Sequence, residues 1–193
     1  VPRSVVKLLS VRSKYSAIIK DKSESAEARQ EACEAYKQYT RDHADATTIL
    51  KAYTYWKRYI SKNHSIITDL FTGLFYTKIT CDECNSISEA FEPFNMISIP
   101  TKDSGRTTLN ECLANFSKEE TLTGSNKYHC STCKKDTNAH KTMYIWEPPT
   151  ILIIHLKRFK NELLAGRYYR QTKTNSIVDF PLTDLTLENN YPP

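Results

Sequence analysis

Four cysteines occur as two Cys-x-x-Cys pairs, Cys81 with Cys84 and Cys130 with Cys133. Each pair can present two sulfurs from one tight turn, and two such turns supply the four thiolates of a tetrahedral zinc site, with Zn–S distances of about 2.3 Å. Four sulfurs fill the coordination sphere, so the ion would stabilise the fold rather than activate water. The spacing therefore predicts one structural Zn²⁺ per chain. The alternatives are chance spacing and a site that has lost its metal.

Other side chains that could do chemistry are Cys33, Cys112, His129, His140 and His155. Cys33 is expected on an amphipathic helix and Cys112 on the buried side of another, where a thiol is inert. Neither has a paired histidine in the sequence. His129 and His140 are not expected to be ligands, because four cysteines already satisfy a zinc ion. For His155, inside an apolar segment, a satisfied core histidine is favoured over a catalytic base. We therefore assign no catalytic residue.

Each cysteine pair follows a segment with the composition of a strand, residues 74–80 and residues 127–129. Forty-five residues separate Cys84 from Cys130, more than the roughly 15 to 20 of a compact zinc ribbon. The segment between the pairs must therefore form structure of its own.

Helices are predicted before residue 66. Apolar residues recur with helical spacing over residues 25–39 and 45–62. We expect these two helices to pack as an antiparallel pair, with Asp45 or Thr47 capping the second. Residues 1–20 show no clean period, so no element is predicted there.

Short strands are predicted beyond residue 70, interrupted by one helix that begins with a capping box of Thr108 and Glu111. The predicted strands cover residues 74–80, 90–99, 142–146, 151–159 and 168–178. The fold class is therefore α+β, with helices first and antiparallel strands after them. We expect two parts, a helical segment of residues 1–66 and a zinc-bearing part of residues 67–193.

Composition excludes several classes of protein. The chain is 39% hydrophobic and 25% charged, with a mean hydropathy of −0.55, values typical of a soluble globular protein. The longest apolar run, residues 151–154, is far shorter than the roughly 20 residues of a membrane span, so no membrane partner is expected. Six cysteines are too few for a disulfide scaffold. The cytosol or the nucleus is therefore the expected location.

The charge disfavours a nucleic-acid partner. The formal net charge of +5 falls to about +3 when four thiolates and one Zn²⁺ are counted. Lys and Arg are interleaved with Asp and Glu rather than clustered on one face. The chain starts at Val1 without an initiator Met or an apolar leader, and we expect it to be a fragment of a longer protein.

The order of the motifs along the chain indicates a protein family. They are residues 68–75 (TDLFTGLF), Cys81-x-x-Cys84, 91–94 (FEPF), 109–113 (LNECL), Tyr128-His129-Cys130-x-x-Cys133, 149–159 (PTILIIHLKRF) and 178–181 (VDFP). In sequence and order they resemble the fingers and palm of the ubiquitin-specific proteases, the ubiquitin carboxyl-terminal hydrolases. The resemblance covers about residues 49–193, including a lead-in at 55–67, and does not extend convincingly to residues 1–48.

The resemblance implies a hand-shaped α+β domain, in which a β-fingers lobe supported by zinc holds the body of ubiquitin and a thumb and palm grip its tail. It places zinc on the two cysteine pairs. It implies a cysteine-type deubiquitinase as the parent protein, with ubiquitin and ubiquitinated proteins as partners and thiol hydrolysis as the chemistry.

Two motifs of that family are not found in the chain, the Gly-Asn-Thr-Cys-type box of the nucleophile and the Gly-His-Tyr-type box of the general base. We therefore expect the chain to supply the ubiquitin-holding lobe and to be inactive alone. A non-enzymatic ubiquitin-binding scaffold with the same zinc site is the alternative, and a zinc-ribbon module for nucleic acid is disfavoured by the dispersed charge.

Overall fold

The computed structural model describes residues 3–164 and 168–192. The chain divides into two compact units, Val1–Lys62 and Asn63–Pro193, and each is described by itself. The boundary expected from the sequence, after residue 66, lies inside helix α4 (Ile66–Phe71) of the second unit.

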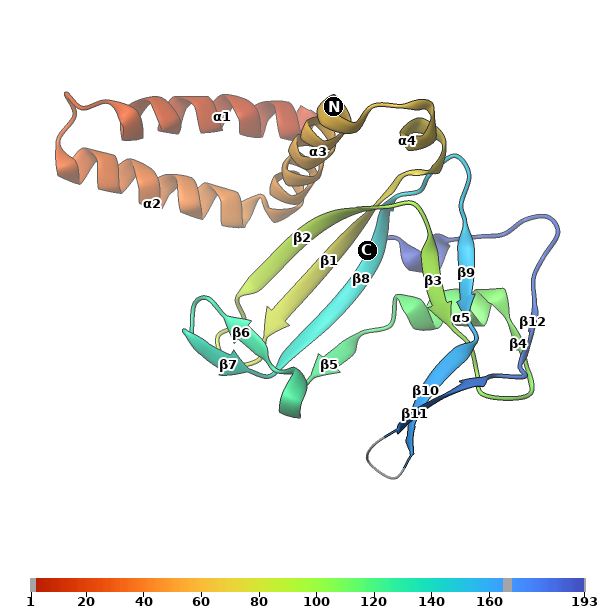
Figure 1. The fold of residues 1–193 in the computed structure, drawn as a ribbon. Helices are drawn as coiled ribbons and strands as arrows, with labels where there is room; N and C mark the ends of the chain where they lie inside the picture. Colours follow the sequence, from red (N-terminus) through yellow and green to blue (C-terminus); the bar gives the residue numbers. More distant parts are fainter. Residues whose placement is uncertain (1–2, 165–167, 193) are drawn as a thin grey trace. The chain divides into compact units, whose positions relative to one another are not determined.

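The first unit consists of three helices, α1 (Arg3–Lys20), α2 (Ala26–Asp42) and α3 (Ala44–Asn63). Helices α1 and α2 lie side by side (Figure 1), and the rings of Tyr15 and Tyr36 meet at 5.9 Å between them. The predicted antiparallel pairing of the helices over residues 25–39 and 45–62 is wrong. The first of them, α2, packs instead along α1, a helix that the sequence did not indicate.

The core of the first unit is small. It consists of Val5 and Leu8 from α1 and Ala46 and Leu50 from α3, with Tyr39 and Ile49 packed against them. The Ser25 side chain caps α2 by accepting a hydrogen bond from the Ala28 N–H. The expected caps of α3 are wrong, since Asp45 and Thr47 lie inside the helix.

A four-stranded antiparallel sheet forms one part of the second unit, with strand order β2-β1-β8-β5. The strands are β1 (Gly73–Cys81), β2 (Ile87–Phe94), β5 (Glu120–Leu122) and β8 (Ala139–Glu147). Aromatic side chains pair across it, since Tyr76 lies opposite Phe91 on one side and Tyr144 on the other. Such cross-strand pairs help to fix the register.

The other strands form two-stranded pairs. Two pairs are parallel, β3 (Ile97–Pro100) with β9 (Ile154–Lys157) and β4 (Arg106–Thr108) with β12 (Ile177–Asp179). Two are antiparallel, β6 (Tyr128–Cys130) with β7 (Lys135–Thr137) and β10 (Phe159–Leu164) with β11 (Tyr168–Lys173). The predicted strands over 90–99, 151–159 and 168–178 are therefore each divided in two.

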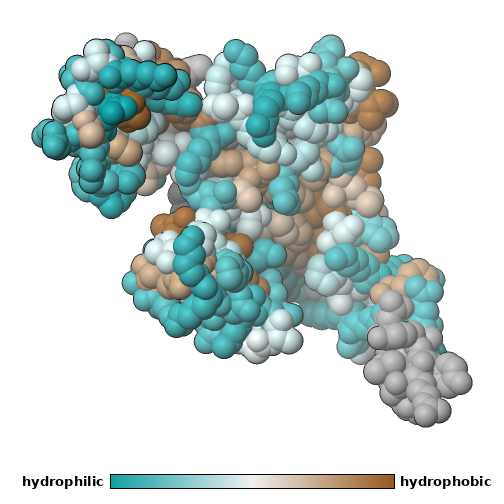
Figure 2. All heavy atoms as spheres, turned by 60° about the vertical axis from the view of Figure 1, so that its left-hand side comes forward, coloured by the Kyte–Doolittle hydropathy of each residue, from teal (hydrophilic) through white to brown (hydrophobic). Residues whose placement is uncertain are grey.

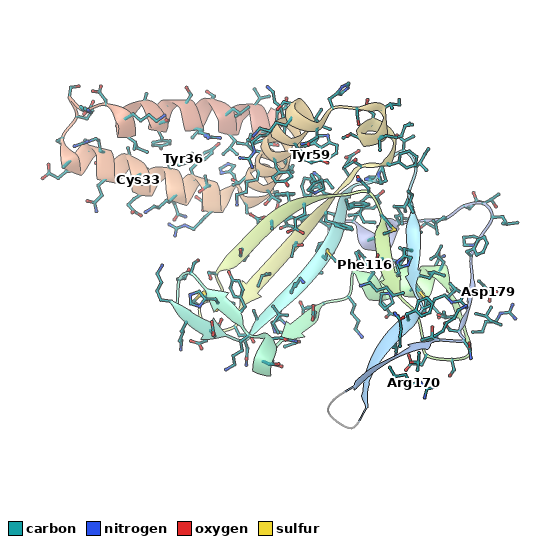
Figure 3. The ribbon with its side chains drawn as sticks, viewed as in Figure 1. Cys33, Tyr36, Tyr59, Phe116, Arg170 and Asp179 are labelled. Atoms are coloured by element: carbon teal, nitrogen blue, oxygen red, sulfur yellow. The ribbon has the colours of Figure 1, made fainter. Side chains whose placement is uncertain are left out.

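Helix α5 (Leu109–Phe116) packs into the core of the second unit, and short 3₁₀ turns η1 (Gly124–Asn126) and η2 (Glu188–Asn190) complete the described elements. The predicted cap is confirmed, because the Glu111 N–H donates to Thr108 Oγ1 at 3.2 Å. Phe116, labelled in Figure 3, lies 5.7 Å from Phe75 between ring centroids. The buried core residues are Phe94, Ile97, Ile99, Leu109, Cys112, Leu113 and Ile145.

Most of the surface visible in Figure 2 is hydrophilic, although large hydrophobic side chains such as Ile66, Ile67 and Ile151 are also exposed. Within the described part of the chain, the helices are all too short or too polar to cross a membrane.

Candidate metal centre

The sulfurs of Cys81, Cys84, Cys130 and Cys133 all lie within 4.8 Å of one another. Two separations are shorter, 4.0 Å from Cys81 to Cys133 and 3.6 Å from Cys84 to Cys130. A tetrahedral zinc site with Zn–S bonds of about 2.3 Å requires sulfurs about 3.8 Å apart. The four sulfurs are thus spaced so that they could bind a metal ion.

The two cysteine turns have the same backbone geometry. The Asn85 N–H donates to Cys81 O at 2.9 Å in the first turn, and the Lys134 N–H donates to Cys130 O at 2.8 Å in the second. Asn85 and Lys134 both have positive φ, 54° and 58°, a conformation that non-glycine residues adopt infrequently. Each turn is therefore bent tightly enough to direct two sulfurs to one point.

The sheet brings the two turns together. The first turn joins β1 to β2, and the β6–β7 hairpin that carries the second lies at the same end of the sheet (Figure 1). The Asp82 N–H donates to Asn138 O at 3.1 Å, just before β8 begins. Glu83 and Lys135 form an ion pair of 2.7 Å between the turns. Strand pairing thus brings together Cys84 and Cys130, which are 46 positions apart in the sequence.

Burial differs within each pair. Cys81 and Cys130, the first members, are fully buried, whereas Cys84 is exposed and Cys133 is half-buried. A bound ion would therefore be enclosed by protein on one side and reachable from solvent on the side of Cys84.

Two hydroxyl groups contact the sulfurs. Thr137 Oγ1 lies 3.2 Å from the Cys81 sulfur, and Ser86 Oγ lies 3.1 Å from the Cys84 sulfur and 3.5 Å from that of Cys130. Neither residue belongs to a Cys-x-x-Cys pattern, so the cysteine spacing does not identify them.

The surroundings of the thiols change their acidity in opposite directions. The Ser86 hydroxyl, followed by the Cys133 N–H, lowers the pKa of Cys130 to about 6. The Thr137 hydroxyl lowers the pKa of Cys81. Hydrogen bonding with Cys84 and burial raise the pKa of Cys133 to about 12. A divalent cation among the sulfurs would favour the thiolate form of all four, so the donor set fits a metal such as zinc.

The histidines lie outside this cluster. His129 pairs with Asp136 at 2.9 Å, and His140 lies 2.9 Å from Glu119. The interpretation of His155 as a core histidine is wrong, because its side chain is exposed on β9, 3.4 Å from Ser98 Oγ.

The two remaining cysteines lie on helices α5 and α2. Cys112 is buried on α5 with 3% of its surface exposed, as the sequence predicts. Cys33 is half-buried on α2, one turn before Tyr36 (Figure 3). Within residues 3–164 and 168–192, neither thiol forms a hydrogen bond with a histidine.

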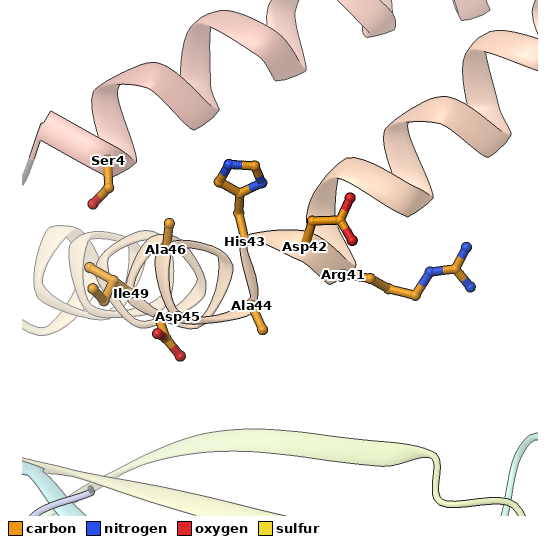
Figure 4. Close-up of a pocket in the computed structure, with 8 residues that line it drawn as sticks. All are labelled: Ser4, Arg41, Asp42, His43, Ala44, Asp45, Ala46 and Ile49. Carbon is orange, nitrogen blue, oxygen red and sulfur yellow. The ribbon is translucent and has the colours of Figure 1, made fainter.

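A pocket of about 430 Å³ occurs in the first unit, where α2 meets α3 (Figure 4). The ring of His43, which lines the pocket, stacks on Tyr39 at 4.1 Å, and His43 Nδ1 lies 2.9 Å from Tyr39 O. The lining residues are Ser4, Arg41, Asp42, His43, Ala44, Asp45, Ala46 and Ile49. No cysteine lines it, and the sequence patterns indicate no function for it.

A family model and two known proteins that match this chain all carry the name ubiquitin carboxyl-terminal hydrolase. The sequence model of the family described as "Ubiquitin carboxyl-terminal hydrolase" matches residues 6–192, a range that includes residues 6–48, where the motifs showed no convincing resemblance. Ubiquitin carboxyl-terminal hydrolase 2 of Gallus gallus is 41% identical over 134 residues, which are 68% of this chain and 36% of that protein. Ubiquitin carboxyl-terminal hydrolase 4 of Eremothecium gossypii is 36% identical over 132 residues, 68% of this chain and 15% of that protein.

A solved structure of the SAGA DUB module that contains Ubp8, Sgf11, Sus1 and Sgf73, bound to monoubiquitin, is also similar. It matches with a TM-score of 0.56 and 26% identity, over 84% of this chain and 34% of that one. The chain thus spans about a third, or less, of each of these three proteins.

Proposed function

Because the chain belongs to the ubiquitin carboxyl-terminal hydrolase family, we propose that its parent protein is a cysteine-type deubiquitinase. Such an enzyme hydrolyses the peptide or isopeptide bond after the C-terminal glycine of ubiquitin by attack of a cysteine thiolate, which a histidine activates. The chain supplies the lobe that holds ubiquitin and does not hydrolyse the bond alone. The family match over residues 6–192 is the observation that carries this proposal.

The metal part of the proposal is one Zn²⁺ bound by Cys81, Cys84, Cys130 and Cys133. Four thiolates leave no open coordination position, so the ion stabilises the fold and does not bind substrate. It joins the end of β1 to the β6–β7 hairpin, and neither this end of β1 nor the hairpin contributes to the hydrophobic clusters found among the described residues. A reducing compartment, the cytosol or the nucleus, suits a site of free thiolates.

Ubiquitin and ubiquitinated proteins are the proposed partners. The similar SAGA DUB module was solved with monoubiquitin bound, and the present chain matches that structure over 84% of its length. Binding of ubiquitin by this chain alone would show that the lobe carries part of the recognition surface.

The test combines three measurements on the purified 193-residue chain: zinc content by elemental analysis, ubiquitin binding by calorimetry, and turnover of a fluorogenic ubiquitin substrate. We expect one zinc per chain, detectable binding and no turnover. A chain that turns over substrate would contradict the assignment of this chain as an inactive lobe. Binding to a DNA oligonucleotide that weakens steeply with salt, without ubiquitin binding, would contradict the proposed partners.

The non-enzymatic scaffold makes the same predictions for this chain, so the full-length parent protein must be assayed too. Turnover by the parent, abolished by an alkylating agent, supports the deubiquitinase. A parent that binds ubiquitin without turnover would instead favour a scaffold.

A further inference from the structure

Two hydroxyl side chains lie at hydrogen-bonding distance from sulfurs of the four-cysteine cluster. Thr137 Oγ1 is 3.2 Å from the Cys81 sulfur, and Ser86 Oγ is 3.1 Å from that of Cys84. A sulfur that binds a metal ion is a thiolate and carries no proton. In the metal-bound protein, the hydrogen must therefore come from the hydroxyl, which donates to the sulfur.

We propose that Thr137 and Ser86 are positioning residues of the metal site, whose hydroxyl groups donate to metal-bound sulfurs and slow the loss of the ion. This inference rests on the zinc site of the proposed function. Four thiolates around one divalent cation carry an excess of two negative charges, and hydrogen-bond donors disperse that charge. Groups that hydrogen-bond to metal ligands orient them and tune their affinity for the metal.

Thr137 acts on the buried side of the site. It is the last residue of β7 and has only 1% of its surface exposed, so water does not compete for its hydroxyl. Its other acceptor is Tyr128 O, at 3.4 Å. Thr137 has one hydroxyl hydrogen, and we expect it to be donated to the Cys81 sulfur, because a charged acceptor forms the stronger hydrogen bond.

Ser86 acts on the exposed side. Its carbonyl oxygen accepts from the Cys81 N–H at 3.0 Å, which fixes the backbone that carries its hydroxyl. From there Ser86 Oγ reaches sulfurs of both turns, Cys84 at 3.1 Å and Cys130 at 3.5 Å. Cys84 is the most exposed of the four cysteines, so a chelator or oxidant meets it first. A hydroxyl that donates to the Cys84 sulfur therefore protects the metal–sulfur bond that is most accessible to attack.

The test uses substitutions that separate the hydroxyl from its shape. Thr137→Val keeps the shape and removes the hydroxyl, Thr137→Ser keeps the hydroxyl and removes a methyl group, and Ser86→Ala removes a hydroxyl. The matched controls are Ser131→Ala and Thr132→Val in the second turn, where both side chains are exposed. The rate of zinc transfer from the 193-residue chain to a chromogenic chelator is measured, with circular dichroism as a check on folding.

We expect Thr137→Val and Ser86→Ala to lose zinc about 10 to 100 times faster, because removal of such partners typically lowers metal affinity by that factor. Thr137→Ser and both controls should match the wild type. In the cobalt-substituted chain, Thr137→Val should also shift the sulfur-to-metal charge-transfer band, which a change in packing alone would not move.

The opposite ranking at position 137, fast loss from Thr137→Ser and wild-type behaviour of Thr137→Val, would show that the residue only fills space and would overturn the inference. Equal rates in all variants would overturn it as well, and would leave the zinc site standing. A wild-type chain purified without zinc and unable to take it up would instead overturn the metal site itself.

Discussion

The side-chain amide of Asn190 donates a hydrogen bond of 2.7 Å to the carbonyl oxygen of Leu113, 77 positions earlier in the chain. The same amide nitrogen lies 2.8 Å from Ser117 Oγ. Leu113 lies in the last turn of α5, and its carbonyl oxygen also accepts a hydrogen bond from the Ser117 N–H at 3.3 Å. Asn190, with 2% of its surface exposed, thus caps α5 from the end of the described chain.

Asn190→Ala should lower the free energy of unfolding of the second unit by about 1 to 3 kcal/mol, because it removes two buried hydrogen bonds, to Leu113 O and to Ser117 Oγ. Urea unfolding is followed by the fluorescence of Trp146 in a Trp56→Phe background, since the chain has two tryptophans. The control is Asn189→Ala, whose side chain is exposed. Equal midpoints for the two variants would contradict this role of Asn190.

The parallel strands β4 and β12 are joined by an ion pair between Arg106 and Asp179, with Nε 2.6 Å from Oδ2 and Nη2 3.0 Å from Oδ1. Figure 3 shows Asp179 on β12. The hydrogen bond from Arg106, helped by its charge, lowers the pKa of Asp179 below its ordinary 3.8. A lowered pKa means that the carboxylate stabilises the fold above pH 3.8 and that this stabilisation is lost as pH falls through the folded-state value.

Asp179→Asn should therefore be less stable than the wild type at pH 7, and the difference should disappear under acid conditions below pH 3.8. Thermal unfolding midpoints of both chains across this pH range provide the measurement. A difference that is the same at pH 7 and at acid pH would show that the charge on Asp179 does not contribute.

Gly73, the first residue of β1, leaves no room for a side chain. A Cβ atom there would lie 2.5 Å from Phe94 Cζ and 2.7 Å from Glu147 O. Its φ is not positive, unlike that of Gly105 and Gly124, so the requirement is for space rather than conformation. Gly73→Ala should cost about 1 to 3 kcal/mol, as overpacking does, measured by urea unfolding as above. A stability equal to that of the wild type would mean that the strands separate at little cost.

Removal of the metal should destabilise the second unit selectively, because a metal that binds only the folded state stabilises it. At a zinc concentration 1,000 times the dissociation constant, the stabilisation is about 4 kcal/mol. Cys81→Ser should lose the zinc and that stability, whereas Cys33→Ser should retain both. Zinc content and the Trp146 unfolding transition are the readouts. Unchanged stability in Cys81→Ser would contradict a structural role for the ion.

The sequence predicts the cysteine cluster well, because two short turns need only a few residues each and their spacing is explicit. The hydroxyls of Ser86 and Thr137 depend on the paths of β2 and β7, and no short pattern identifies them. Thr108 is likewise predicted, since a capping box is local. Predictable features are therefore those that an explicit short pattern marks, either a single local motif or two matching motifs.

Helix α1 was missed because little in its own sequence supports it. It contains many Val, Ile and Ser residues, which are weaker helix formers than Ala or Leu. Val5 and Leu8 are buried against residues of α3, so packing with residues some 40 positions later stabilises the helix.

The longer strands overlap predicted ranges, but their limits and faces differ from the prediction, and the short strands β4, β5 and β7 were not predicted. The run over 151–159 suggests one buried strand, yet β9 belongs to a two-stranded pair. In that pair Ile154 and Leu156 pack against the core and His155 is exposed. A sequence of apolar residues does not show whether both faces of a sheet are covered.

The pairing of β1 with its two neighbours has a consequence for the order of folding. Thr80 pairs with Ile87 across a loop of six residues, whereas Cys81 pairs with Ala139 across 57. Loop-closure entropy makes the second pairing about 2 kcal/mol less favourable, so the β1–β2 hairpin should form first, with Cys81 and Cys84 already side by side. An ion bound by these two sulfurs would have half of its ligands. The turn that forms later would add the sulfurs of Cys130 and Cys133. In that order, a metal ion would act during folding as a guide to strand pairing.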